Sequence, residues 1–132
     1  MSFARVVRST LLSVVVLAAF APTARADVVL GKVLPLRQPD GTTLQVRIWG
    51  DEFYTVVESL DGYTLVRDPD TGYICYAVLA DDANSLVSTG VVVGTVSPAA
   101  LGLVPHIRIT AEAAAAQARA AREAFERLQA EG

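Results

Sequence analysis

The fold is decided by the stretch Pro39-Asp40-Gly41-Thr42-Thr43-Leu44-Gln45-Val46-Arg47-Ile48, in which a turn sequence leads into alternating apolar and polar residues. An aspartate followed by a glycine that tolerates positive φ is typical of a tight turn between antiparallel strands. Successive side chains of a strand point to opposite faces of the sheet. We therefore expect Leu44, Val46 and Ile48 to face a core, with the polar residues between them facing water.

Two further turn sequences, Asp61-Gly62 and Asp70-Thr71-Gly72, repeat this pattern downstream. Turns spaced by roughly 10–20 residues suit a meander and leave too little chain for crossover helices. We predict a mainly β domain over residues 27–97, either an antiparallel meander sheet or a partly closed barrel. The expected strands, besides the one in the opening stretch, lie near residues 28–36, 52–59, 63–67 and 73–79, with a last pair near 86–88 and 91–95.

The strand expected over residues 73–79 is apolar on both of its faces. One face would pack inward on the sheet, so the other face needs a cover. We expect this cover to be the C-terminal helix or the surface of a partner.

The composition changes after Pro98, where Gly and Pro interrupt apolar residues and predict a linker over residues 98–109. Ala, Glu, Arg and Gln then predict an Ala-rich helical tether over residues 110–132, which completes an α+β fold. Thr110 is the expected N-cap, with Glu112 favourably placed in the first turn. The apolar face of this helix is shallow, so the helix should dock weakly or stand free as a spacer. The residues of that face are Ala114, Ala118, Ala121, Phe125 and Leu128.

Residues 1–26 have the organisation of a secretory signal peptide. Two arginines, Arg5 and Arg8, precede an uncharged apolar run over residues 11–21, and small residues follow. This run is shorter than the roughly 20 residues that a membrane-spanning helix needs. We predict a signal-peptide helix that is cleaved between Ala26 and Asp27, a secreted or periplasmic product, and no membrane association after cleavage.

The predicted product is acidic. The first 26 residues carry three arginines and no acid, so the remainder has eight basic and 14 acidic side chains. A surface of this charge repels phosphate backbones, because nucleic-acid binding depends on clustered Lys and Arg. We therefore expect no nucleic-acid partner.

The sequence contains too few reactive side chains for a catalytic site. His106 is the only histidine and lies in the predicted linker, whereas a catalytic zinc needs three protein ligands. A Ser or Cys nucleophile would need a positioned base, and only that one imidazole is present. We expect His106 to be solvated or to satisfy a turn, and we predict no enzyme activity, metal or cofactor for the chain.

The remaining candidates for chemistry have structural interpretations. Cys75, the only cysteine, has apolar neighbours and should be buried and inert, although an intermolecular disulfide or a thiol switch stays open. Residues 68–72 suggest the start of a calcium loop, but Leu79 stands where that loop needs a bidentate glutamate, so a plain turn is expected. Asp51 and Glu52 should form a strand-entry turn rather than an acid/base pair.

Four short blocks together resemble a known family. They are Gln38-Pro39-Asp40-Gly41-Thr42, Val46-Arg47-Ile48-Trp49-Gly50-Asp51-Glu52-Phe53, Asp61-Gly62-Tyr63-Thr64-Leu65-Val66 and Gly72-Tyr73-Ile74-Cys75-Tyr76-Ala77. In this order and spacing they resemble the N-terminal pro-region of secreted zinc metallopeptidases of the immune inhibitor A type. The residues that carry the motif turns are Asp40, Gly41, Gly50, Asp51, Glu52, Asp61, Gly62 and Tyr63.

This resemblance implies a module that works beside a zinc catalytic domain. No zinc-binding HExxH helix occurs in the 132 residues, so the resemblance supplies no catalytic residue. It implies that the chain assists the folding of a metallopeptidase catalytic domain, in cis or in trans, or occludes the active-site cleft. The alternative is an independent exported binding module whose apolar strand face holds a partner unrelated to proteolysis.

Overall fold

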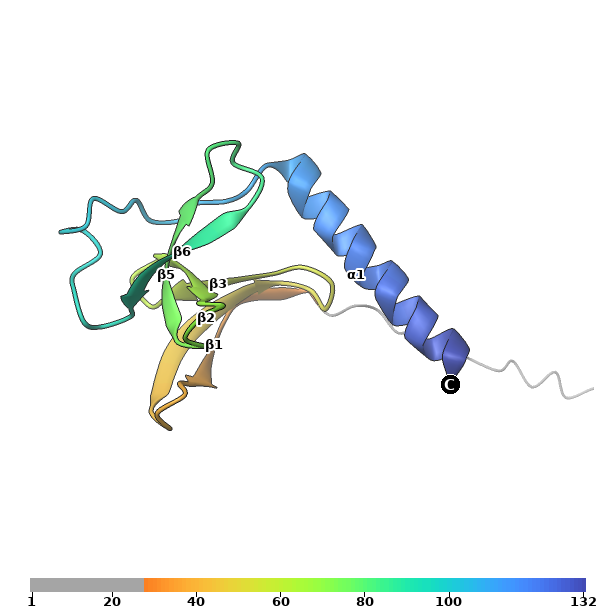
Figure 1. The fold of residues 1–132 in the computed structure, drawn as a ribbon, viewed down its shortest axis with the longest axis horizontal. Helices are drawn as coiled ribbons and strands as arrows, with labels where there is room; N and C mark the ends of the chain where they lie inside the picture. The colour runs from red at the N-terminus through yellow and green to blue at the C-terminus, as the bar shows by residue number, and fades with distance from the viewer. Residues whose placement is uncertain (1–27) are drawn as a thin grey trace, which may run out of the picture.

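The computed structural model describes residues 28–132, so the predicted signal peptide and its cleavage site at Ala26 and Asp27 lie outside the described residues. The described chain forms a six-stranded antiparallel sheet followed by one helix, which confirms the predicted mainly β fold with a C-terminal α-helix (Figure 1). The elements are β1 (Val29–Arg37), β2 (Thr43–Gly50), β3 (Thr55–Ser59), β4 (Thr64–Arg67), β5 (Ile74–Leu79), β6 (Leu86–Val92) and α1 (Ala111–Glu131).

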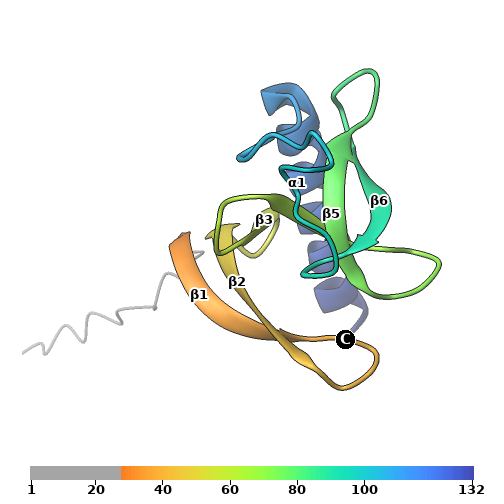
Figure 2. The ribbon, with the colours of Figure 1, turned by 90° about the vertical axis from the view of Figure 1, so that its left-hand side faces the viewer.

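The sheet is an open meander. Its strands lie side by side in chain order from β1 to β6, and each neighbouring pair is antiparallel. β1 and β6 are not paired with each other, so the sheet is not a closed barrel. It is nevertheless strongly curved, with the long β1–β2 hairpin bending across from β5 and β6 (Figure 2).

The β1–β2 hairpin contains the alternating stretch. The backbone N–H of Gln38 donates to the carbonyl oxygen of Thr42 at 2.8 Å, and Gly41 between them has φ 86°. Val46 is fully buried, and Leu44 and Ile48 pack against the same core. The predicted orientation of this strand is therefore confirmed.

The hydrophobic core lies on the concave side of the curved sheet. Its buried centre consists of Val46, Leu65, Ile74 and Tyr76. Because these residues come from β2, β4 and β5, the core forms only when three segments distant in sequence meet. The partly buried residues packed against it are Leu34, Leu36, Leu44, Ile48, Val57, Tyr63, Val91, Val93 and Leu103.

The predicted last pair of strands is wrong, because residues 86–92 form a single strand, β6. The two predicted strands, near 86–88 and 91–95, are separated in sequence by Thr89-Gly90. Gly90 has φ 74°, and the pairing of β5 with β6 is irregular between Cys75 and Ala77, so the glycine bends the strand without ending it. The hydroxyl of Thr89 donates to the carbonyl oxygen of Tyr76 and holds the bent strand in place.

The cover on β5 is also different from the expected one. The four residues Ile74 to Ala77 are all buried, but α1 does not lie on this strand. Instead the linker runs past it, and Leu103, Val104 and Ile107 face Ala77 across a shallow hollow. The linker is thus part of the folded domain and not a free connection.

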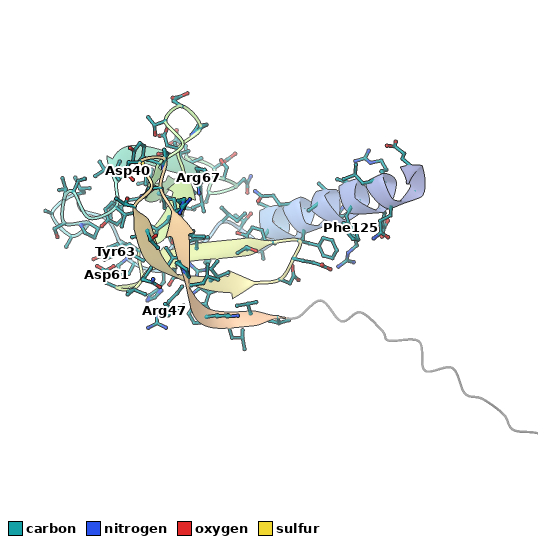
Figure 3. All side chains as sticks on the ribbon, turned by 90° about the horizontal axis from the view of Figure 1, so that it is seen from below. Asp40, Arg47, Asp61, Tyr63, Arg67 and Phe125 are labelled. Carbon is teal, nitrogen blue, oxygen red and sulfur yellow. The ribbon has the colours of Figure 1, made fainter. Side chains whose placement is uncertain are left out.

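Helix α1 forms as the sequence predicts and then projects from the sheet (Figure 1). The Thr110 hydroxyl accepts the backbone N–H of Ala113, which confirms the N-cap. The backbone of α1 packs along none of the six strands. Its contact far from the N-terminus is aromatic: the ring of Phe125 meets the edge of Phe53 at a centroid distance of 6.2 Å, and Arg122 lies 4.9 Å above the Phe53 ring (Figure 3). No helix among residues 28–132 is long and apolar enough to cross a membrane.

Gly50 is a position where only glycine fits. It has φ 117°, and a Cβ atom there would lie 2.1 Å from the carbonyl oxygen of Tyr54. We expect Gly50→Ala to lower the free energy of unfolding by about 3 kcal/mol or more. Gly41→Ala, which has a similar backbone but open space around the Cβ, should cost only about 1 kcal/mol. Urea denaturation measures both, and equal losses would contradict the steric argument.

Candidate functional site

The centre of the sheet contains a buried charge. Glu58 lies on β3, opposite Arg47 of β2 and Thr64 of β4, and its side chain is 1% exposed. A carboxylate removed from water is strongly destabilising unless it is paired and hydrogen-bonded. The partners of Glu58 therefore decide whether this sheet is stable.

Both hydrogen-bond partners of Glu58 come from the linker. The Nη2 group of Arg108 donates to Oε1 of Glu58 at 2.6 Å. Nδ1 of His106 lies 3.0 Å from Oε1 and 3.1 Å from Oε2. An ionised carboxylate only accepts hydrogen bonds, so Nδ1 of His106 is the protonated nitrogen that donates. His106 has φ 59° and lies in a turn, and from there its ring reaches the same carboxylate as the side chain of Arg108, two residues later.

Backbone contacts fix the linker on the same site. The backbone N–H of His106 donates to the carbonyl oxygen of Gly62 at 2.8 Å, and the Thr64 hydroxyl donates to the carbonyl oxygen of Ile107. A Cβ atom on Gly62 would lie 2.7 Å from the His106 ring. Glycine at position 62 therefore lets the imidazole lie close to the turn and reach Glu58.

The surroundings of Glu58 favour its charged form. Burial alone would raise the pKa of this carboxyl. The hydrogen bonds from His106 and Arg108, together with the attraction of their charges, outweigh burial and hold the pKa of Glu58 below its ordinary value. Both oxygens of this carboxylate accept hydrogen bonds from these partners.

An open groove adjoins the buried carboxylate. It is lined by Arg47, Trp49, Leu60, Asp61 and His106, together with Glu58 and Gly62. The side chain of His106 is 65% exposed and lines the groove, while its Nδ1 atom is directed to Glu58. The labelled side chains of Arg47 and Asp61, which line the groove, can be followed in Figure 3.

Of the eight turn residues named for the family-like blocks, only Asp61 and Gly62 line this site. Asp61, Gly62 and Tyr63 form the β3–β4 turn under the linker, where Asp61 is hydrogen-bonded to Ser59 and Tyr63 packs on Tyr76. Asp40 and Gly41 lie in the β1–β2 turn, and Gly50, Asp51 and Glu52 follow β2. The motif residues therefore occupy three separate turns and form no common cluster.

The acids of the other turns are structural, as predicted. Asp51 accepts the backbone N–H groups of Phe53 and Tyr54, and these bonds lower its pKa. Asp68 accepts a hydrogen bond from the Ser88 hydroxyl and the N–H groups of Asp70 and Thr71, and its pKa is lowered in the same way. The calcium-loop interpretation therefore has no support from the arrangement.

Cys75 is buried, as its apolar neighbours indicate. Among residues 28–132 no group of three His, Cys, Asp or Glu side chains is placed to hold a metal ion.

The sequence did not lead us to Glu58 or Arg108 as site residues, and it did not predict the contact that His106 makes with Glu58. The expectation of a solvated histidine is correct for the exposed part of its ring and wrong for Nδ1. One signal was available: Glu58 continues the alternation of the strand Thr55-Val56-Val57-Glu58-Ser59 on the face of Val56, which is buried. A carboxylate on a buried face requires cations, and the sequence does not say which ones reach it.

Comparison of the chain with protein-family models, with curated proteins and with solved structures gave no match. The fold and the buried carboxylate define a class in physical terms: an open antiparallel meander that is fastened to its own linker by an ionic cluster. The resemblance to the pro-region of immune inhibitor A type peptidases stays a prediction.

Replacement of Glu58 by glutamine tests the ionic cluster of Glu58, His106 and Arg108. Glutamine keeps the shape of the glutamate side chain and removes its charge. We expect Glu58→Gln to lower the free energy of unfolding by about 1–3 kcal/mol, since hydrogen bonds to charged groups contribute about that much. The amide of His106 should also exchange faster with solvent as the linker loosens. Glu52→Gln is the control, because Glu52 is exposed, and a loss as large as that of Glu58→Gln would contradict the role of the cluster.

The pH dependence of stability follows from the lowered pKa of Glu58. In the unfolded chain this carboxyl takes up a proton at a higher pH than in the folded chain, so the stabilisation is complete above the unfolded value and is lost as pH falls through the folded one. Denaturant titrations from pH 7 down to about pH 3 should show this loss. Asp40, Asp51 and Asp68 have lowered pKa values too, so the wild type minus Glu58→Gln difference isolates Glu58. A difference that does not change with pH would contradict the assignment.

Proposed function

We propose that this chain is a pro-region-like module of an exported zinc metallopeptidase and that it is itself non-catalytic. The order and spacing of the four sequence blocks support the proposal. So does the observation that carries it: Glu58 fastens the linker to the sheet, while α1 packs along no strand. A domain of this form can hold a helix at a fixed point and leave the helix free to reach a second domain.

Helix α1 forms an arm beside the sheet, and the length of this arm suits the proposed role. Helix α1 contains 21 residues, so it extends about 30 Å from its N-cap. The Thr110 amide bonds to the carbonyl oxygen of Ala83 and its hydroxyl bonds to Asn84, which ties the start of the arm to the β5–β6 turn. A catalytic domain bound in cis or in trans would therefore be held at a restricted distance from the sheet. The module would assist folding of that domain or occlude its cleft.

An independent exported binding module remains the second candidate. The observation that favours it is the unpaired edge at β1, which exposes Leu30 and Val33. The coding sequence after Gly132 separates the two candidates: an HExxH-bearing domain there supports the peptidase relation, and an unrelated neighbour favours the binding module.

A direct test mixes the purified chain with a peptidase of the immune inhibitor A type. We expect a lower peptidase activity or a higher refolding yield of the catalytic domain at micromolar concentrations of the chain. Glu58→Gln should weaken either effect, because it loosens the start of the arm, whereas Glu52→Gln should leave it unchanged. Absence of any effect on activity and on refolding yield would overturn the proposal.

A further inference from the structure

Among residues 28–132, no strand pairs with the outer edge of β1, so this edge carries unpaired backbone groups. The closing pair of the hairpin, Gln38 with Thr42, is hydrogen-bonded, and bonded and non-bonded pairs alternate along an antiparallel ladder. Lys32, Leu34 and Leu36 therefore direct their backbone groups to β2. Val33, Pro35 and Arg37 direct theirs outward, and so does Leu30, which pairs with Trp49 beyond the irregularity at Gly31.

Proline blocks half of this edge. Pro35 has no N–H, so the outward row loses one donor in the C-terminal half of β1. The N-terminal half keeps the outward N–H and carbonyl groups of Leu30 and Val33. An added strand could pair there over a short length and could not continue past Pro35.

The exposed aliphatic side chains lie at the same half of the edge. Leu30 is 77% exposed and Val33 is 44% exposed. On the next strand they pair with Trp49 and Arg47, which line the groove described above together with the exposed Leu60. Unpaired backbone and an apolar surface therefore coincide at one place, which defines an edge site formed by Leu30, Val33, Arg47, Trp49 and Leu60.

Two cationic side chains flank the edge site, Arg47 on the face of the groove and Lys32 on the opposite face of β1. Arg47 donates to the carbonyl oxygen of Gly31 and forms no ion pair among the described residues. Lys32 lies on β1 itself, and it forms none either. Of the acids that line the groove, Glu58 is ion-paired with Arg108 and hydrogen-bonded to His106, whereas Asp61 accepts a hydrogen bond from Ser59.

These charges argue against a second copy of the chain as the occupant. Antiparallel pairing of β1 with β1 of another copy would bring the two Lys32 side chains close together, and like charges in neighbouring cross-strand positions are destabilising. A segment of alternating apolar and acidic residues avoids this repulsion, because its carboxylates would lie on the face of Lys32 while its apolar side chains lie on the face of Val33 and Trp49.

We propose that the N-terminal half of β1 is a docking site for an extended, acidic segment of a partner polypeptide, which adds to the sheet as a short seventh strand. The backbone groups of Leu30 and Val33 supply the pairing, and the apolar side chains of the edge site cover alternate residues of the segment. The inference does not require that the partner be a peptidase.

A pair of pentapeptides tests this proposal with the purified chain. The probes are acetyl-Val-Glu-Val-Glu-Val-amide and its lysine counterpart, and Trp49, the only tryptophan, reports binding by fluorescence. We expect saturable binding of the acidic peptide, about tenfold weaker binding of the basic one, and slower amide exchange at Leu30 and Val33. No binding, or equal binding of both peptides, would overturn the proposal.

Two substitutions separate backbone pairing from simple apolar contact. Val33→Pro removes an outward N–H without breaking a bond to β2, and Pro35 shows that this edge accommodates proline. It should weaken binding by about tenfold, whereas Val33→Thr, which keeps the N–H, should change affinity much less. Unchanged affinity in Val33→Pro would overturn strand addition. A wild-type dimer that Val33→Pro converts to a monomer would assign the edge to a second copy and overturn the acidic partner.

Discussion

The carboxylate of Glu58 has almost no exposed surface, and it obtains its counter-charges from outside the sheet. His106 and Arg108 belong to a segment that follows the last strand, about 50 residues away in sequence. A buried carboxylate without them would be strongly destabilising. The sheet and the linker therefore stabilise each other, and neither is complete alone.

The position of α1 depends on this ionic cluster. Because the linker is fixed at Glu58 and at Gly62, the helix starts from a defined place beside the β5–β6 turn. Beyond its first turns it is held chiefly by Phe53 and Phe125, a contact worth only about 1 kcal/mol beyond its buried area. The domain thus combines a rigid base with a loosely held arm, which is the property that the proposed pro-region role uses.

The two ends of β1 differ in the backbone groups that they leave available for pairing with another strand. Near the turn, Pro35 interrupts the outward row of donors and protects the edge from added strands. Near Gly50, the edge keeps its donors and exposes Leu30. The same strand therefore limits unspecific pairing at one end and offers a short pairing surface at the other, beside an arginine without a carboxylate partner.

Local sequence determined the strands, most turns and the helix, because these depend on period-two alternation, on glycine at positive φ and on the Thr110 cap. It did not determine that β6 runs through Gly90, since a glycine at positive φ can end a strand or only bend it. It also placed His106 in a linker without showing what that histidine contacts. Only the tertiary structure decided that Glu58, His106 and Arg108 meet, because the electrostatic requirement of a buried carboxylate is met by whichever cations the folded chain brings within reach.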